Sequence, residues 1–347
     1  MTTSITILSI ETSCDETAMS LCSIEKKELN NFSFKIHSEK IFSQFEIHTP
    51  YGGVVPELAA REHLRALPLL LESTLTEINT TKDSITHIAV TRGPGLKGSL
   101  LAGDGFAIGL AAAWKKPILS VHHIEGHMFS PFINSDSDLF TLKFPYLSLV
   151  VSGGHTELCI VKDIGKYELL SKTVDDAAGE AFDKAAQLLN LGMPGGPKIS
   201  QLAEKGRLSK YVLPEVMKGQ QSFSFSGLKT AISLLIKSNK NNVHEETFLS
   251  EISYTIQSAI VRSLVEKVKM AVSSTGIKTM LVSGGVSANQ FLRDELTLLS
   301  GISCIFPSLK HTGDNATMIA LAGGLRELSG KSLRKDLVAA SWDMYSQ

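Results

Sequence analysis

Residues 123–127, His-Ile-Glu-Gly-His, contain two histidines four positions apart. On an α-helix residues four apart lie on one face, so both imidazoles could reach a single cation. Pairs with this spacing also arise by chance, and the alternative is two core histidines without a ligand role. In zinc proteases the catalytic glutamate directly follows the first histidine. Here Glu125 comes two positions after His123, about 200° around the helix. We therefore expect it to point away from the cation, which disfavours peptidase chemistry.

A third ligand has to come from elsewhere in the chain, and Asp314 is the candidate. It stands directly before the helix that the sequence predicts over 316–328. Two imidazoles and one carboxylate with open coordination positions suit Fe(II) or Zn(II). The alternative is that Asp314 only caps that helix. The predicted metal ligands are thus His123, His127 and Asp314.

Three glycine-rich turns form a second set of candidates, at residues 152–154, 194–197 and 283–285. Backbone amides in such turns bind phosphate or approach a sugar closely. Turns need glycine in any case, so one of them alone is weak evidence. Three in one chain, each beside a strand end, indicate a nucleotide cleft.

A fourth glycine-rich segment, residues 93–98, matches the pattern G-x-G-x-x-G. A dinucleotide site also needs an acidic residue about 20 positions on, after the next strand. The next predicted strand, 118–121, ends in two histidines instead. We interpret this segment as a tight turn that packs a helix on a strand.

Two strand–turn–strand passages indicate the architecture. Residues 5–10 and 19–24 flank one polar turn, and residues 147–151 and 157–161 flank the other. The shared pattern indicates an approximate duplication of one unit, and hence two related α/β lobes with parallel strands and a cleft between them. The predicted domains are an N-terminal lobe (1–135), a C-terminal lobe (136–314) and a helical segment that returns to the N-terminal lobe (315–347).

Apolar periodicity predicts helices between these strands. One begins at Pro56, and another, over 176–189, would carry three acids on one face, where a carboxylate could hold ribose hydroxyls or simply be solvated. Ser287 and Gln290 have capping-box spacing after a strand at 279–283. The side chains expected on the two helix faces are Leu58, Leu64, Leu67 and Leu71 in the first helix, and Asp176, Glu180 and Asp183 in the second.

The composition excludes several classes of protein. The 347 residues carry 34 Lys+Arg and 35 Asp+Glu, a formal charge of −1, which disfavours a generic polyanion binder. With 43% hydrophobic and 20% charged residues the chain is not disordered. Its four cysteines form no C-x-x-C pair, which disfavours a disulfide framework or thiolate zinc site. There is no secretory signal or apolar run near the roughly 20 residues of a membrane span, so we expect a cytoplasmic protein.

Five segments together resemble a known family. They are 10–17 (IETSCDET), 123–127 (HIEGH), 151–156 (VSGGHT), 223–229 (FSFSGLK) and 284–289 (GGVSAN). In this order, over essentially the whole chain, they resemble the bacterial-type tRNA N6-adenosine threonylcarbamoyltransferases, the TsaD family, which once carried the name glycoprotease. The resemblance implies a two-lobed actin/hexokinase/Hsp70-like (ASKHA) fold with duplicated lobes around a nucleotide cleft. It also implies metal-dependent transfer of threonylcarbamoyl from threonylcarbamoyl-AMP to N6 of the adenine 3′ of the anticodon, in tRNAs that read codons beginning with A.

The resemblance also implies residue roles. His123, His127 and Asp314 would hold one Fe(II) ion per chain, with Zn(II) as the alternative. The acyl-adenylate part of the donor would contact Val150, Val151, Ser152, Gly153 and Gly154. Its ribose and adenine would contact Asp183, Gly196 and Asn289, and ATP or AMP could occupy the same place. Ser200 stands where family members often have Asp, although a hydroxyl can still bond a sugar.

The donor is a mixed anhydride that is already activated, so we expect no covalent nucleophile. The implied partners are tRNA, a paralogous inactive subunit and a small P-loop ATPase, with a separate synthase making the donor. Because a charge of −1 suits tRNA poorly, we expect other subunits to help dock it. The alternatives are an ASKHA-type ATPase or sugar kinase, a metallopeptidase, and a non-catalytic paralogue, which should lack the histidines and Asp314.

Overall fold

The structure, a computed structural model, describes most of the chain. It covers residues 3–133, 138–206, 209–214, 217, 219–239, 245–333, 338–339 and 341–345. The chain divides into two compact units, unit 1 with Met1–Phe144, Lys162–Tyr167 and Pro307–Gln347, and unit 2 with Pro145–Val161 and Glu168–Phe306. The units change over at 144/145 and 306/307, and the turn between β8 and β9, residues 162–167, belongs to unit 1. The sequence suggested 314/315 and 135/136, of which the latter lies outside the described residues.

Unit 1 is built on one sheet. Its strands are β1 (Thr3–Glu11), β2 (Glu16–Glu28), β3 (Asn31–Ser43), β4 (His87–Gly93), β5 (Ile118–His122) and β6 (Leu139–Thr141). They lie in the order β5-β4-β1-β2-β3-β6. Neighbouring strands β1, β2 and β3 are antiparallel, whereas β4 runs parallel to β1 and β5 parallel to β4. The first predicted hairpin, between β1 and β2, is therefore confirmed.

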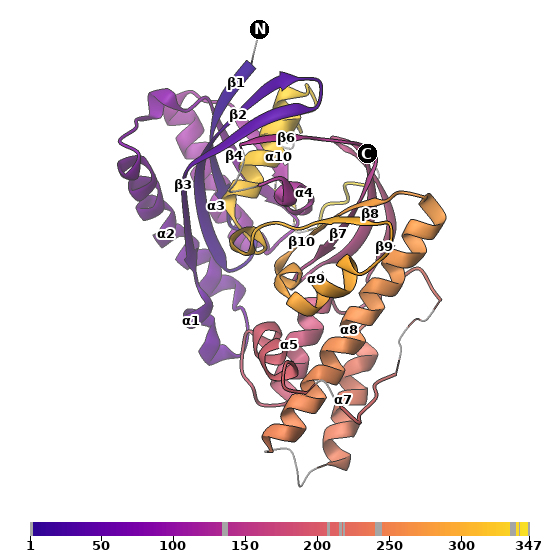
Figure 1. Cartoon of the computed structure of the whole chain (residues 1–347). Helices are drawn as coiled ribbons and strands as arrows, with labels where there is room; N and C mark the ends of the chain where they lie inside the picture. The colour runs from indigo at the N-terminus through magenta and orange to yellow at the C-terminus, as the bar shows by residue number, and fades with distance from the viewer. Residues whose placement is uncertain are drawn as a thin grey trace. The chain divides into compact units, whose positions relative to one another are not determined.

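Helices cover both faces of this sheet. Successive side chains of a strand point to opposite faces, and here the strands carry apolar side chains on both. On one face Ile7 and Ile24 share a core with α10 (Ala316–Leu328). On the other, Leu8 and Met19 share a core with α2 (Pro56–Glu77) and α3 (Lys97–Trp114). Figure 1 shows α2 and α10 on opposite sides of strands β1 to β3. The shorter helices of unit 1 are α1 (Phe45–His48), α4 (His123–Phe129) and the 3₁₀ turns η1 (Thr49–Tyr51), η2 (Lys82–Ser84), η3 (Ser130–Phe132) and η5 (Leu309–His311).

Unit 2 repeats this arrangement of strands. Its strands are β7 (Tyr146–Val151), β8 (Thr156–Asp163), β9 (Lys166–Lys172), β10 (Thr279–Ser283) and β11 (Ser303–Ile305). Their order, β11-β10-β7-β8-β9, matches the order β5-β4-β1-β2-β3 in unit 1. Here too the middle strand, β7, pairs in antiparallel fashion with β8 and in parallel with β10. The second predicted hairpin and the duplication of one α/β pattern are confirmed.

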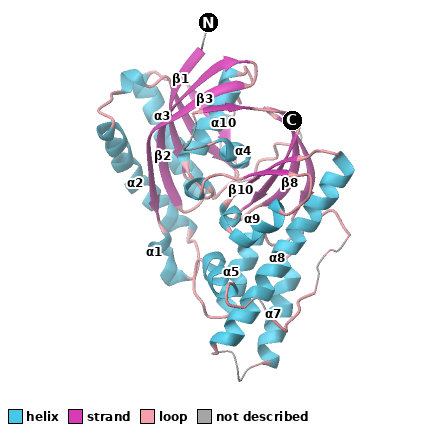
Figure 2. Ribbon diagram, viewed as in Figure 1, coloured by secondary structure: helices cyan, strands magenta, loops and turns pink. Residues whose placement is uncertain are grey.

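The helices of unit 2 are α5 (Ala178–Leu188), α6 (Gly195–Ala203), α7 (Ser226–Ser238), α8 (Glu246–Thr275), α9 (Gln290–Thr297) and the 3₁₀ turn η4 (Gly285–Ala288). Leu149 and Val282 of the sheet share one core with Phe182 of α5 and Ile256 of α8. Helix α5 contacts both α7 and α8, and Figure 2 shows these three helices in the same part of unit 2. None of the helices in the described part of the chain is both long and apolar enough to cross a membrane.

Helix α2 begins at Pro56 as predicted, but one side chain expected in the core is outside it. Leu64 is 58% exposed. The buried stripe of this helix consists of Ala59, Glu62, His63, Ala66, Leu67 and Thr74. Leu67 is buried and Leu71 packs against the same core, as predicted. Apolar periodicity missed the polar members of the stripe, Glu62 and His63, which have hydrogen-bond partners.

Two predicted helix starts in unit 2 are also corrected. Asn289, and not the Ser287/Gln290 pair, caps α9: its Oδ1 accepts from the Leu292 backbone N–H at 2.9 Å. Residues 285–288 form η4 first, so the α-helix begins later than the capping-box spacing suggested. Asp176 lies before α5, not on it, and pairs with Lys184 at 2.6 Å.

Glu39 of β3 fixes the segment that precedes α10. Its carboxylate accepts from Thr317 Oγ1 at 2.5 Å and from His311 Nε2 at 3.2 Å, and lies 2.6 Å from Lys310 Nζ. Burial opposes ionisation of this group, but the hydrogen bonds from His311, Lys310 and Thr317 outweigh it and lower the pKa of Glu39 to about 2. The ionised form is therefore favoured by folding.

A lowered pKa contributes stability above the ordinary value of 4.5, and this contribution disappears as the pH falls towards 2. We expect Glu39→Gln to lower the free energy of unfolding by about 2 kcal/mol at pH 7 and by clearly less at pH 3. Urea denaturation at both pH values measures this. The control is Glu246→Gln, whose ion pair with Lys205 is exposed. An equal loss for Glu39→Gln at both pH values would contradict the prediction.

Candidate functional site

The two histidines of the candidate metal centre lie on α4, directly after β5. His122 ends the strand and caps the helix: its Nδ1 accepts from the Ile124 backbone N–H at 3.2 Å. All residues of α4 are buried. His123 and His127 stand one turn apart on the same face, and their rings lie edge to face with centroids 4.7 Å apart.

Asp314 lies between η5 and α10 and faces both histidines. Its Oδ1 is 3.0 Å from His127 Nε2 and 3.6 Å from His123 Nε2. One ligand atom from each of the three residues lies within 4.8 Å of the others. The structure thus brings together side chains that are 187 positions apart in the chain, all of them within unit 1.

The alternative role for Asp314, as the cap of the last helix, is wrong. Asn315 caps α10, because its Oδ1 accepts from the Met318 backbone N–H at 2.8 Å. Asp314 therefore precedes the cap, and its side chain is directed to the histidines instead of the helix.

Glu11, at the end of β1, orients one of the two imidazoles. Its Oε2 lies 3.2 Å from His123 Nδ1, and the carboxylate also accepts from the Ser13 backbone N–H and from Thr91 Oγ1, both at 2.5 Å. A carboxylate can only accept here, so Nδ1 carries a proton, and Nε2, which faces Asp314, is the ring atom that would lose its proton to bind a cation. Glu11 was not among the predicted site residues. Its signals in the sequence were an acid at the end of an otherwise apolar strand and its place in the family-like segment 10–17.

Carboxylates dominate the charge around this centre. Burial opposes protonation of His123, but the charges of Asp314 and Glu11 outweigh it and raise the pKa of His123 to about 9. Burial and the charges of Asp314 and Asp15 raise the pKa of Glu16 to about 9 as well. The cluster favours a positive charge at its middle, as a divalent cation would supply. Two imidazole nitrogens and a carboxylate oxygen are donors that fit Fe(II) or Zn(II).

Glu125, the residue on which the peptidase alternative depends, is directed elsewhere. It is fully buried, and both of its oxygens accept from Arg326 Nε, at 2.7 and 2.8 Å. Tyr167 OH also donates to it. The prediction that Glu125 points away from the metal ligands is confirmed, and no carboxylate of this helix is left to act as a peptidase base.

The glycine-rich segment 93–98 packs against the turn between β1 and β2. The Leu96 backbone N–H donates to the Ser13 carbonyl at 2.8 Å, and a Cβ on Gly95 would lie 2.5 Å from the same oxygen. The glycine is therefore needed for close approach of two backbone segments. This confirms a packing turn and explains the dinucleotide-like pattern without a ligand.

In unit 2 the predicted donor-binding residues Val150, Val151, Ser152, Gly153 and Gly154 form the end of β7 and the turn after it. Ser152 closes the turn by accepting from the His155 backbone N–H at 3.1 Å. The Gly179 backbone N–H, in α5, donates to the Ser152 carbonyl at 3.2 Å. Gly284, with φ +89°, approaches so closely that a Cβ there would lie 2.4 Å from the Val151 carbonyl oxygen. Two of the three predicted glycine turns thus meet at the ends of β7 and β10.

The third glycine turn meets Asp183. The Gly195 backbone N–H donates to Asp183 Oδ1 at 2.7 Å, and burial raises the pKa of this carboxyl group. Gly196 follows in the first turn of α6 and has open space where a side chain would begin. One carboxylate of the predicted acidic face therefore lies beside the Gly-Gly turn, whereas Asp176 and Glu180 pair with Lys184.

Ser200 and Asn289 are joined by a residue that the sequence analysis did not select. Gln257 of α8 accepts through Oε1 from Ser200 Oγ at 2.7 Å and from Asn289 Nδ2 at 2.8 Å, and Asn289 Nδ2 also donates to Ser200 Oγ at 2.7 Å. Asn289 Nδ2 therefore uses both of its hydrogens, on Ser200 and Gln257, while Oδ1 accepts from α9 as its cap. Gln257 carried no sequence signal, since it is one polar position in a long helix.

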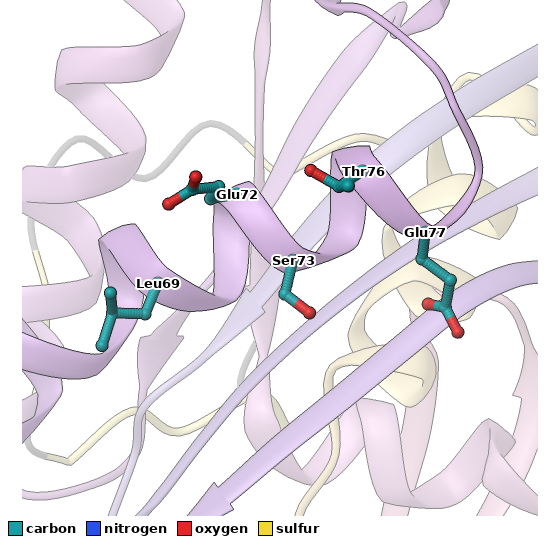
Figure 3. A pocket seen from close by; sticks show the side chains of 5 residues that line it. All are labelled: Leu69, Glu72, Ser73, Thr76 and Glu77. Atoms are coloured by element: carbon teal, nitrogen blue, oxygen red, sulfur yellow. The ribbon is translucent and has the colours of Figure 1, made fainter.

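The described residues also form a hollow on α2, lined by Leu69, Glu72, Ser73, Thr76 and Glu77 (Figure 3). Figure 3 shows these side chains along one helix, with Glu77 directed towards a neighbouring strand. Glu77 is engaged there by Lys40 at 3.0 Å. None of the predicted site residues lines this hollow.

Comparison with known sequences gives one consistent result. The family model TsaD, described as tRNA N6-adenosine threonylcarbamoyltransferase, matches residues 35–321. A protein of that name from Albidiferax ferrireducens is 42% identical over 346 residues, with 96% of this chain and 95% of that protein covered. One from Nitrosospira multiformis is 43% identical, with 98% of both chains covered.

Comparison with solved structures concerns the fold alone. The HypF protein of T. kodakarensis has a TM-score of 0.56 at 14% identity, over 94% of this chain and 48% of that one. A full-length HypF in a phosphate- and nucleotide-bound form has a TM-score of 0.55 at 14% identity, over 94% of this chain and 55% of that one. These similarities confirm the predicted actin-like α/β fold with a duplicated sheet.

Proposed function

Because the chain belongs to the tRNA N6-adenosine threonylcarbamoyltransferase family, TsaD, we propose that it is an acyltransferase acting on tRNA. It transfers the threonylcarbamoyl group of threonylcarbamoyl-AMP to N6 of the adenine 3′ of the anticodon, in tRNAs that read codons beginning with A. The observation that carries this proposal at the level of the site is the convergence of His123 Nε2 and His127 Nε2 on Asp314 Oδ1. A tRNA acceptor makes the cytoplasm the place of the reaction.

His123, His127 and Asp314 would hold one Fe(II) ion, or alternatively Zn(II). Such an ion supplies Lewis acidity where negative charge develops during acyl transfer. The chain's own contribution is orientation: Glu11 fixes the tautomer of His123, and the Asp314 carboxylate lies within 3.6 Å of both Nε2 atoms. These contacts hold the three donor atoms in place before any ligand arrives.

The nucleotide part of the donor would bind in unit 2. The exposed glycines 153 and 154 leave the backbone of that turn open to a phosphate. Asp183 and Ser200 are acceptors for sugar hydroxyls. Asn289 would act by fixing Ser200 and Gln257, since its own amide hydrogens are already engaged.

No covalent nucleophile is required, because the donor is a mixed anhydride. A hydroxyl does lie beside the metal centre: Ser13 Oγ is 3.2 Å from His123 Nδ1. Glu11 faces the same ring nitrogen, so His123 cannot take a proton from Ser13 with one nitrogen while Glu11 orients the other. The geometry supports direct attack by the adenine amine on the donor carbonyl, with binding and orientation supplied by the protein.

The proposed activity is tested by expressing the full chain, with its own partner subunits, in a bacterium depleted of its transferase. We expect N6-threonylcarbamoyladenosine to return in total tRNA, measured by digestion to nucleosides and mass spectrometry. Soluble protein without any return of the modified nucleoside would contradict the proposal.

The partners belong to the same proposal: a paralogous inactive subunit and a small P-loop ATPase assist the chain, and a separate synthase makes the donor. With a formal charge of −1, the isolated chain should bind tRNA only with the affinity of a non-specific complex, about 10⁻⁴ to 10⁻⁶ M at physiological salt. Fluorescence anisotropy with labelled tRNA measures this for the chain alone and for the assembled complex. Equally tight binding by both would contradict the need for partners.

A further inference from the structure

We propose that Glu125 and Arg326 form a positioning pair that fixes α4 against α10, and thereby sets the geometry of the three metal ligands. This inference rests on the proposed metal centre and extends it to two residues that touch none of the ligand atoms. Glu125 stands between the two histidines of α4. Arg326 belongs to α10, the helix that Asp314 precedes.

The pair is buried and its hydrogen bonds are satisfied. Glu125 is 0% and Arg326 7% exposed, and Arg326 Nε lies 2.7 and 2.8 Å from the two carboxylate oxygens. Tyr167 OH donates to the same carboxylate, and an Arg326 guanidinium N–H donates to the Lys331 carbonyl at 3.1 Å. A charged pair with this many partners has one favoured arrangement, unlike an apolar contact that can slide.

Next to the ion pair, side chains of α10 pack directly on the backbone of α4 at Gly126. A Cβ on Gly126 would lie 3.0 Å from Ile319 Cδ1 and 3.1 Å from Met318 Cγ. Gly126 therefore permits the close approach of the two helices, and the Glu125–Arg326 pair fixes the position of α4 along α10. Since short helices move as rigid bodies, a shift between these two moves His123 and His127 relative to Asp314.

Stability alone does not account for the pair. A buried ion pair is often no more stabilising than apolar residues of similar volume, because both charges lose their hydration. Neither carboxylate oxygen of Glu125 is available for proton transfer, since both accept from Arg326. A role in fixing the distance between α4 and α10 accounts for a charged pair at this position.

The test measures Zn(II) affinity by competition with a chromophoric chelator, and separately the free energy of unfolding of the metal-free chain. Glu125→Gln should lose both stability and about tenfold in Zn(II) affinity, as outer-shell changes do. The double variant Glu125→Leu/Arg326→Leu should regain stability but not affinity. The matched control is Asp104→Asn, which breaks another buried arginine–carboxylate pair of unit 1, with Arg92 at 2.7 Å, and should keep wild-type affinity.

Gly126→Ala tests the same register without changing charge and covers the case in which the double variant does not fold. Its added methyl should weaken Zn(II) binding several-fold, while the cost of overpacking to stability is offset in part by the higher helix propensity of alanine. Recovery of affinity together with stability in the double variant, or wild-type affinity in Glu125→Gln and Gly126→Ala, would overturn the positioning role and leave the metal centre intact. Absence of stoichiometric Zn(II) or Fe(II) binding by the wild-type chain would overturn both.

Discussion

Replacing His123 and His127 together by alanine should remove the bound metal and reduce threonylcarbamoyl transfer at least about 100-fold. A Lewis acid at an acyl-transfer centre stabilises developing charge by several kcal/mol, and each 1.36 kcal/mol is tenfold in rate. With two of three donors gone, the single carboxylate of Asp314 is too small a donor set to hold a transition metal. Metal content after anaerobic purification and the modified nucleoside in tRNA are the two measurements.

His48→Ala is the matched control for this variant. His48 is also a buried histidine of unit 1, 3% exposed, and its ring nitrogens face Gln44 Oε1 and the Val55 backbone N–H. It should lose stability, since a buried donor and acceptor are left unpaired, and keep its metal. A double-histidine variant that transfers at the wild-type rate would exclude any role for a metal held by these residues.

The fold could be predicted where local pattern decides it. The hairpins β1–β2 and β7–β8 are apolar strands around short polar turns, which specify antiparallel pairing without long-range information. The bounds of α10 follow from a polar cap before Ala316 and an apolar run over 318–325. The buried face of α2 could be predicted only in part: Leu67 and Leu71 follow the apolar period, but buried Glu62 and His63 depend on hydrogen-bond partners that only the tertiary structure supplies.

The same distinction holds for the candidate site. The histidine spacing is local, and it was enough to predict that the two imidazoles share one helix face. Glu11 contacts a histidine 112 positions later, and Gln257 contacts a serine 57 positions earlier, so no periodicity contains either pair. The pairing of Glu125 with Arg326, 201 positions away, was equally out of reach. The helical period was enough to predict the direction in which Glu125 points. Its partner, Arg326, could be identified only from the tertiary structure.

Glu11→Gln should be the most damaging single change that leaves all three metal ligands in place. The carboxylate accepts from three donors, the Ser13 backbone N–H, Thr91 Oγ1 and His123 Nδ1. An amide has only one acceptor atom, so in one orientation its NH₂ group faces His123 Nδ1 and in the other it faces the Ser13 N–H. In the first orientation the imidazole proton has to move to Nε2, the atom that faces Asp314. In the second, the amide NH₂ group and the Ser13 backbone N–H are two donors that face each other.

We therefore expect Glu11→Gln to lower metal affinity by about 10- to 100-fold and transfer at limiting metal by a similar factor. Thr91→Val is the control: it removes one donor to Glu11 but leaves the tautomer of His123 unchanged, so affinity should stay within a few-fold of wild type. Excess metal should restore transfer in Glu11→Gln, as it cannot in the double-histidine variant, because the ligand nitrogen is still present and only its proton has to be displaced. Wild-type affinity in Glu11→Gln would mean that His123 reaches its ligand tautomer without this carboxylate.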